Sequence, residues 1–403
     1  MTNFVILSPH FPETYWKFAE GLKKNGVNVL GIGDAPYHEL SPQLKNVLTE
    51  YYFCPNMVIY SDLYKAFAYF SFKYGKIDWV ESNNEFWLEK DAKLRTDFNL
   101  ANGIRQQDIL AYKSKSEMKK YYQEAQVKVA RHLKSNNPEE VKAFAMQVGY
   151  PLFAKPDIGV GANSTFRLNS AEQVDAFFLK KDNTEYIIEE FINGTIVSFD
   201  GICNSKHEPV LYLNHLFPVP NDIAVNEKAD DYYYSLADIA SDLEAAGRRV
   251  LKAFKVQKRF FHLEFFRLNE DKPGLGLKGD LVALEVNMRP PGGFTTEMIS
   301  ACLGVNCYQV WADVIIYDEN RQVGSGVKAV VVEVARRDNH RYAHTPEEIM
   351  LAYSQHIIMK GRYSPIISVG MGDTFYIASF PTFEEADLFR HFVLKHQESI
   401  SPI

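Results

Sequence analysis

The sequence has few cysteines, and they do not form a metal or redox motif. The four residues, Cys54, Cys203, Cys302 and Cys307, lack paired CxxC spacing. A disulfide or a zinc site formed by these cysteines is therefore not expected. Reduced thiols in a core or loop are typical of an intracellular protein, so we expect a cytoplasmic location without disulfides.

Leader-like and membrane-like segments are also missing. The start, MTNFVILSPHFPETYW, has no basic stretch before a long apolar run, so we expect no secretory signal peptide. No apolar run reaches the roughly 20 residues of a membrane span. The net charge is −7, so a general affinity for nucleic acid or for an anionic membrane is not expected. Any bound phosphate would need local positive charge.

Two glycine fingerprints of nucleotide binding are absent as well. The first apolar segment is followed by SPHFP, where a dinucleotide-binding fold would have a GxGxxG turn. No GK[ST] sequence opens a helix after a glycine loop, which excludes a P-loop. Phosphate binding, if present, must use another arrangement.

What the sequence does contain is a sizeable α/β pattern. With 403 residues, 46% hydrophobic and 24% charged, the chain is long enough for two or three globular domains. Apolar segments at 4–8, 27–33 and 77–82 alternate with helical patterns such as 13–24. This alternation predicts an open, Rossmann-like parallel sheet in the first hundred residues.

The rest of the chain predicts α+β units. Ser114 and Glu117 form a capping-box pattern for a helix that ends near Glu124. Further helices are predicted at 138–148, 170–180, 237–254, 296–302 and 382–395, and strands at 151–157, 166–168, 186–203, 260–268, 280–287 and 328–337. We expect the last part to be a small α+β cap.

The most informative stretch is a pair of apolar strands, FFHLEFFRL and DLVALEVNMRPPGG, each interrupted by a glutamate. If Leu268 and Leu281 close a hairpin, counting back places Glu264 opposite Glu285. Alternation along each strand then puts both acids on one face. Two facing carboxylates repel each other, and the cost is larger inside a sheet.

A divalent cation would remove that repulsion. The same register places His262 opposite Asn287, and Asn287 shares the face of Glu264 and Glu285. An all-oxygen set suits Mg²⁺, which takes one or two carboxylates together with phosphate oxygens and water. The alternative is an edge hairpin whose acids face water, although its Phe and Leu neighbours favour burial.

A lysine inside an apolar strand is the second chemical feature. Lys155, in PLFAKP, needs an anionic partner or a route to solvent. The turn that follows contains Gly159 and Gly161, whose backbone N–H groups can bind phosphate, and the hydroxyl of Ser164. This combination favours a polyphosphate site. A lysine whose ammonium reaches solvent remains the alternative.

Other charged residues allow a structural or a functional interpretation. Lys113 taken alone reads as a solvated surface charge. Glu189 and Glu190 end a strand, either with one acid on each face and at least one in water, or as a hinge whose backbone binds an adenine edge. Arg289, before PPGG, offers a planar fork for a carboxylate or phosphate.

Four further residues stay open at this point. His215 and His262 read as structural residues, although His262 adjoins the acidic face. Arg336 and Arg337 read as a solvated pair, with contact to an anionic substrate as the alternative.

The order of these pieces resembles the ATP-grasp superfamily of ATP-dependent carboxylate–amine ligases, including its L-amino acid ligase and biotin carboxylase-like members. The resemblance implies an ATP-grasp fold preceded by an open parallel-sheet domain. It implies metal binding by Glu264, Glu285 and Asn287, and catalytic roles for Arg289 and Lys155. The implied nucleotide contacts are Lys113, Lys155, Gly159, Gly161, Ser164, Glu189, Glu190 and Ile192.

The sequence departs from that family in two places. Many members have an acid shortly after the hinge that contacts ribose, whereas this chain has Ile196 and Val197 there. Asp200 is the alternative ribose contact. The hairpin between the two metal carboxylates is also longer than in many members.

The resemblance implies domains at 1–110, 111–190 and 191–403. It implies amide synthesis through an acyl phosphate, with ATP and Mg²⁺ (or Mn²⁺) as cofactors and a small-molecule carboxylate and amine, one of them an amino acid, as substrates. Nucleic acid and membrane partners are not expected, and a homodimer is left open. The alternatives are an enzyme that activates bicarbonate or formate, and a non-catalytic ATP-binding protein.

Overall fold

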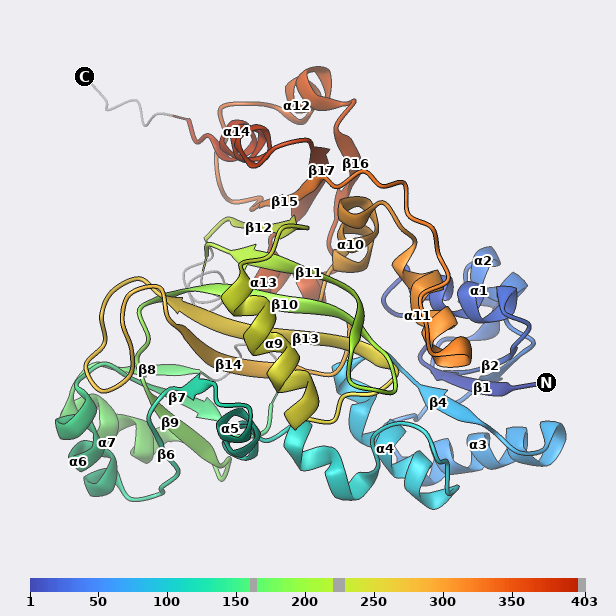
Figure 1. Cartoon of the computed structure of the whole chain (residues 1–403), viewed down its shortest axis with the longest axis horizontal. Helices are drawn as coiled ribbons and strands as arrows, with labels where there is room; N and C mark the ends of the chain where they lie inside the picture. The colour runs from blue at the N-terminus through green and yellow to red at the C-terminus, as the bar shows by residue number, and fades with distance from the viewer. Residues whose placement is uncertain (160–164, 220–228, 398–403) are drawn as a thin grey trace.

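The described part of the chain contains three β-sheets, and Figure 1 shows them side by side. The structure is a computed structural model that describes residues 1–159, 165–219 and 229–397. Colour follows the chain from the N-terminal unit through the small sheet to the large central sheet and the C-terminal elements.

The first sheet is parallel, with strand order β3-β2-β1-β4, as the alternating pattern predicts. Its elements are β1 (Asn3–Leu7), α1 (Trp16–Lys24), β2 (Asn28–Gly33), α2 (Pro42–Val47), β3 (Glu50–Phe53), α3 (Tyr60–Tyr74), β4 (Trp79–Glu81) and α4 (Leu88–Asp97). Short 3₁₀ helices lie at Tyr37–Glu39, Glu85–Trp87 and Gln106–Tyr112.

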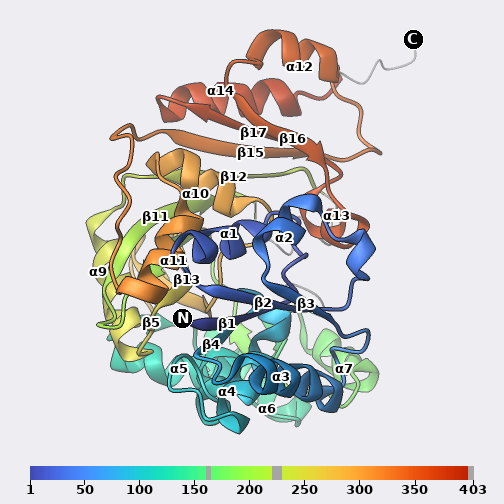
Figure 2. The same ribbon diagram turned by 90° about the vertical axis from the view of Figure 1, so that its right-hand side faces the viewer.

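Helices cover both faces of this sheet, which explains its continuous apolar strands. Phe4 and Ile6 pack in the core on the α1 side, while Val5 and Leu7 pack in the core on the α3 side. Figure 2 shows α1 and α2 on one side of the strands and α3 and α4 on the other.

The second sheet is small and antiparallel, with order β6-β9-β7-β8. Its elements are β6 (His132–Leu133), α6 (Pro138–Val148), β7 (Leu152–Pro156), β8 (Phe166–Leu168), α7 (Ala171–Lys180) and β9 (Tyr186–Glu190). It follows α5 (Lys115–Glu124), which begins where predicted, because Ser114 Oγ accepts a hydrogen bond from the backbone of Glu117.

The third sheet has nine strands in the order β16-β17-β15-β12-β11-β10-β13-β14-β5. Its strands are β5 (Lys128–Val129), β10 (Gly194–Cys203), β11 (Pro209–Phe217), β12 (Asp231–Leu236), β13 (Arg259–Leu268), β14 (Leu281–Asn287), β15 (Val330–Arg336), β16 (Ile357–Arg362) and β17 (Thr374–Phe380). Its helices are α9 (Ser241–Ala253), α10 (Thr295–Leu303), α11 (Cys307–Tyr317), α12 (Pro346–Tyr353), α13 (Pro365–Met371) and α14 (Phe383–Leu394).

The C-terminal elements continue the large sheet. β15 pairs with β12 and β17, and α14 packs its apolar side against these strands. β5, although it precedes the small sheet in sequence, pairs with β14. The limits 1–110, 111–190 and 191–403 remain our proposed domain division.

Helices α10 and α11 join the first unit to the large sheet. No single helix among the described residues is long and apolar enough to cross a membrane, and only this pair passes that test together, bent by 89° at the break. Trp311 of α11 is buried against Phe18 of α1, with ring centroids 5.0 Å apart. The pair therefore packs inside the protein.

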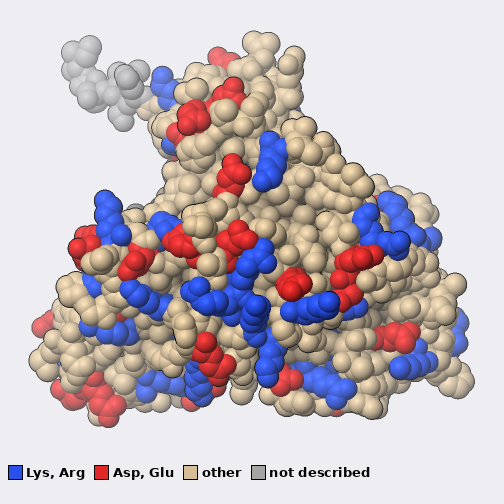
Figure 3. Space-filling view, in the orientation of Figure 1, with Lys and Arg blue, Asp and Glu red and all other residues tan. Residues whose placement is uncertain are grey.

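Charges of both signs are interspersed on the face of Figure 3. Lys and Arg side chains gather across its middle, over the region of α9, with Asp and Glu beside them.

Candidate functional site

The two glutamates of the β13–β14 hairpin face each other. Glu264 pairs with Glu285 and His262 pairs with Asn287, as the sequence predicts. The assumed pairing of Leu268 with Leu281 was wrong by one residue, because Leu281 pairs with Arg267. A β-bulge between Glu264 and Phe265 shifts the register by one and restores the predicted acid pair.

These side chains are not the solvated acids of an edge hairpin. Glu264 and Asn287 are buried, and the Glu285 side chain is 25% exposed. β14 lies between β13 and β5, so the hairpin is inside the sheet. Oxygen ligands from three residues therefore lie on one partly enclosed face.

Lys155 on β7 points at an acid of the same sheet. Its Nζ lies 2.9 Å from Glu189 Oε2, and Nζ of Lys119 lies 2.5 Å from Glu189 Oε1. Burial works against the charge on Glu189, but Lys119 and Lys155 outweigh it and hold the pKa of that carboxyl far below its usual range. Two ammonium groups thus converge on one carboxylate.

Lys155 and the facing glutamates, Glu264 and Glu285, interact electrostatically. Burial lowers the pKa of Lys155, but Glu189, followed by Glu285 and Glu264, outweighs this effect and raises it. Lys115 provides a direct link, with Nζ 3.1 Å from Glu285 Oε1 and 3.5 Å from the carbonyl oxygen of Gly159. The strand lysine and the acid pair therefore belong to one site.

Lys113 and Arg289 meet at a third acid, on the edge of this site. Lys113 Nζ lies 2.9 Å from Glu85 Oε1, and Arg289 Nε lies 3.9 Å from Glu85 Oε2. Arg289 also donates to the carbonyl of Pro290 at 2.9 Å. Lys113 is buried, so the solvated interpretation of this lysine was wrong.

Comparisons with known proteins point to one fold. No protein-family model matches the sequence. The L-arginine-specific L-amino acid ligase of Bacillus subtilis is 23% identical over 255 residues, or 61% of this chain and 59% of that protein. The match thus spans less than two thirds of that relative's length.

Solved structures match over nearly the whole chain. L-amino acid ligase from Bacillus licheniformis superposes with a TM-score of 0.72 at 14% identity, covering 97% of this chain and 96% of that one. The biotin carboxylase domain of the Hydrogenobacter thermophilus 2-oxoglutarate carboxylase, in complex with MgADP, ADP and bicarbonate, gives 0.66 at 14% identity, covering 98% and 90%. The chain shares the ATP-grasp fold of these proteins. The fold expected from the order of motifs is therefore confirmed.

Glu189 and Glu190 at the end of β9 are both buried, so the interpretation with at least one solvated acid was wrong. Glu190 Oε1 accepts from the backbone N–H and Nε of Arg131, at 2.8 and 3.0 Å, and Lys272 lies 3.4 Å from Oε2. Ile192 is buried in the adjoining apolar cluster. Contact of this strand end with adenine stays a prediction.

Two buried histidines and Asp200 form a chain of contacts that ends at Glu264. Nδ1 of His215 and Nδ1 of His262 each lie 2.5 Å from an oxygen of Asp200, and His262 Nε2 lies 3.6 Å from Glu264 Oε1. Burial opposes a charged His262, but Asp200 and Glu264 raise its pKa to about 9. His262 is therefore protonated at neutral pH beside a metal-type acid.

These histidine contacts correct the expectation that Asp200 could bind the ribose. Asp200 is fully buried and both of its oxygens are occupied by histidines. It is not available to a ribose, and Ile196 and Val197 beside it are buried apolar residues.

Arg336 and Arg337 are buried as well, so the solvated interpretation was wrong. Arg336 donates to the carbonyls of His344 and Val393, and Arg337 donates to that of Ser368. These arginines tie the C-terminal elements together through backbone carbonyls.

Two site residues escaped the sequence analysis, namely Lys115 and Lys119. They lie four residues apart on α5, so one helix face carries both. That spacing was the available signal, but their partners Glu285 and Glu189 lie far away in sequence. Gly161 and Ser164, predicted to cover the phosphates, lie outside the described residues, and Gly159 borders them.

Proposed function

We propose that this ATP-grasp protein is an ATP-dependent carboxylate–amine ligase that forms an amide bond through an acyl phosphate, with an amino acid as substrate. One observation carries the proposal. Lys155, whose side chain is 16% exposed, lies within electrostatic range of Glu285 and Glu264, which face each other on a separate sheet. This arrangement provides positive charge for phosphates next to oxygen ligands for a cation.

The acid face fits Mg²⁺, or Mn²⁺ as the alternative ion. Glu264, Glu285 and Asn287 present only oxygen ligands, which hard cations prefer. Burial disfavours a charged Glu264, but protonated His262 outweighs it and lowers the pKa of Glu264, so the carboxylate is ionised at neutral pH. These three residues would hold the ion, and such an ion, when bound, neutralises the charge of the ATP phosphates.

The chemistry proceeds in two balanced steps. A substrate carboxylate oxygen attacks the γ-phosphorus of ATP, and the bond from that phosphorus to the ADP oxygen breaks, which gives an acyl phosphate and ADP. The amine nitrogen then attacks the acyl carbon, phosphate leaves, and the nitrogen loses a proton. The first step supplies a leaving group that a free carboxylate lacks.

The residues of this chain contribute mainly by alignment and charge. Lys155 and Lys119 would bind nucleotide phosphates, and their pairing with Glu189 fixes both ammonium groups in advance. Arg289 lies beside Asn287, with Nη2 3.5 Å from Oδ1, and would bind the acyl phosphate or a substrate carboxylate. Lys113, at the edge of the site beside Glu85, would also interact with the negative charge of the phosphates.

The amino-acid substrate class rests on the relatives. The sequence relative and one structural neighbour are L-amino acid ligases, while the other neighbour is a carboxylase domain in complex with bicarbonate. The relative found by sequence, 23% identical over 255 residues, is an L-amino acid ligase. We therefore place amide synthesis ahead of bicarbonate or formate activation, and ahead of nucleotide binding without turnover.

The test is ADP release from Mg·ATP across a panel of amino acids, single and in pairs, with bicarbonate and formate as parallel arms. Release that requires amino acids, with formation of a dipeptide or related amide, supports the proposal. Release that requires bicarbonate or formate favours the second enzyme class. Tight ATP binding with no release in any arm favours a binding protein.

A further inference from the structure

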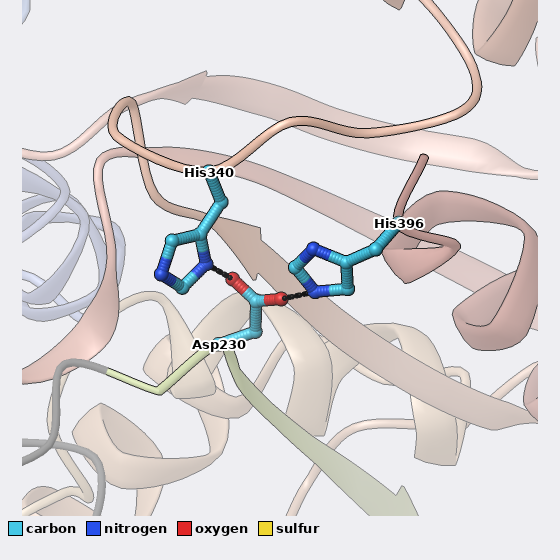
Figure 4. Close-up of side chains that lie close together, drawn as sticks. All are labelled: Asp230, His340 and His396. Atoms are coloured by element: carbon cyan, nitrogen blue, oxygen red, sulfur yellow. Dashed lines mark hydrogen bonds and ion pairs between the residues drawn. The ribbon is translucent and has the colours of Figure 1, made fainter. Parts of the chain in front are cut away.

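A cluster of two histidines and an aspartate lies apart from the ATP-grasp site. Asp230 stands just before β12, His340 lies in the loop after β15, and His396 follows α14. In the large sheet, β11 and β10 separate β12 from the acid-bearing strand β13. Figure 4 shows the two imidazoles on opposite sides of the carboxylate, each with one nitrogen directed at it.

The distances in this cluster are short. His340 Nδ1 lies 3.0 Å from Asp230 Oδ1, and His396 Nε2 lies 2.9 Å from Asp230 Oδ2. One ligand atom from each of the three residues lies within 4.8 Å of the others. Ligands of a tetrahedral zinc ion lie about 3.4 Å apart, as follows from bonds of about 2.0–2.1 Å. The cluster is therefore wider than a zinc-bound set of ligands by at most about 1.4 Å.

The surrounding residues hold the ligands in place. The Tyr342 hydroxyl donates to Asp230 Oδ1 at 2.5 Å and accepts from the backbone of Arg337 at 2.7 Å. Orienting bonds of this kind are typical around metal ligands. Tyr342 also forms a backbone bridge with His396, which aligns the segments that carry the two histidines.

The donor types select the ion. Two imidazole nitrogens and one carboxylate oxygen suit Zn²⁺, whereas Mg²⁺ requires an oxygen-rich shell. The Asp230 and His340 side chains are 10% and 26% exposed, and that of His396 is 53% exposed. An ion can therefore reach the cluster from solvent, and a water molecule can complete its coordination.

We propose that Asp230, His340 and His396 form a binding site for Zn²⁺ that fastens the segment after α14 to the start of β12. This site is independent of the proposed ligase activity. Its three ligands come from segments more than fifty residues apart, so a bound ion would cross-link the C-terminal part of the fold and stabilise it.

The experiment uses the full chain without a polyhistidine tag, in excess Mg²⁺ so that oxygen sites are saturated. Equilibrium dialysis against Zn²⁺, followed by elemental analysis, measures the ions bound per chain. The four cysteines are all buried and therefore compete little for the ion. We expect one Zn²⁺ per wild-type chain, and a rise in Tm on its addition.

Three variants identify the ligands: Asp230→Asn, His340→Gln and His396→Gln. Each should weaken Zn²⁺ binding by more than about 100-fold, because loss of a mere orienting partner typically costs about 10- to 100-fold. Tyr342→Phe should fall in that smaller range. His396→Gln, at an exposed position, keeps the test valid if Asp230→Asn does not fold.

The matched control is His391→Gln. His391 is an exposed histidine near the same end of the chain, with Nδ1 3.2 Å from Asp387 Oδ2, but it lies outside the cluster. It should bind Zn²⁺ and gain Tm as the wild type does. Absence of a bound equivalent in the wild type, or wild-type affinity in His396→Gln and His340→Gln, would overturn the proposal.

Discussion

The ammonium group of Lys115 lies 3.1 Å from the carboxylate of Glu285. This contact links α5, which leads into the small sheet, to the acid pair of the large sheet. The lysine stands beside an oxygen that we assign to a divalent cation, so lysine and ion compete for the same negative charge.

We therefore expect Lys115→Gln to bind Mn²⁺ about three- to tenfold more tightly than the wild type in the absence of nucleotide, since a partly buried ion pair contributes on the order of 1 kcal/mol. Mn²⁺ titration measures this directly. Lys120→Gln is the control, because Lys120 lies on the same helix but pairs with exposed Glu117. Unchanged or weaker Mn²⁺ binding in Lys115→Gln would argue against competition.

Lys155→Met should weaken Mg·ADP and Mg·ATP binding by about 10- to 100-fold, because it removes a partly buried charge that we assign to the phosphates. Glu189 keeps Lys119 as a partner, so the fold should survive. Calorimetric titration measures the affinity. Lys142→Met, which removes a surface lysine paired with Glu139 and Asp175, should bind as the wild type does, and equal affinity of the two variants would count against the assignment.

Arg289→Lys should lower kcat for ADP release about 100-fold or more while nucleotide affinity stays near that of the wild type. Lysine keeps the charge but loses the planar fork that binds two oxygens, and loss of one such donor costs a few kcal/mol of transition-state stabilisation. Steady-state kinetics and nucleotide titration separate the two effects. A variant with normal kcat and weakened ATP binding would move Arg289 to the nucleotide.

The raised pKa of Glu333 makes the stability of the folded chain depend on pH. Burial raises the pKa of this carboxyl from 4.5 to about 7, against hydrogen bonds from Tyr363 and from Tyr233 at 2.7 Å. The folded chain therefore keeps a proton that the unfolded chain releases above about 4.5. Stability from this group is complete below that pH and is lost as the pH rises through about 7.

Glu333→Gln removes this dependence. Relative to the wild type, the variant should gain roughly 3 kcal/mol in the free energy of unfolding between about pH 4.5 and about pH 8, an upper value for a shift of this size. Urea unfolding at both pH values measures the difference. A stability difference that is the same at both pH values would contradict the assignment.

How far the sequence predicts this protein depends on the element. Ser114 and its helix, and the facing of Glu264 and Glu285, follow from local capping and from alternation. Helix α11 was missed because nearly all of its residues are apolar and buried, so it shows no 3.6-residue period. The sequence analysis also missed α12 and β16 (Ile357–Arg362). They lie in a polar stretch, and every second residue of β16 is exposed.

The site was predicted in part for a similar reason. Lys155, Glu264 and Glu285 interrupt apolar strands, so they can be recognised from the sequence alone. Lys115 and Lys119 sit on a helix rich in charge, and only the folded chain shows that they contact Glu285 and Glu189. The burial of Arg336 and Arg337 likewise depends on carbonyls supplied by distant segments.

The most direct test of the account is amino-acid-dependent ADP formation by Glu285→Ala compared with the wild type, with circular dichroism and Tm to verify the fold. We predict that ADP formation is nearly abolished while the fold stays intact, because the variant lacks one of the two facing carboxylates that would hold the cation. ADP formation at the wild-type rate in a folded Glu285→Ala chain would contradict the assignment of this hairpin as the metal–nucleotide site.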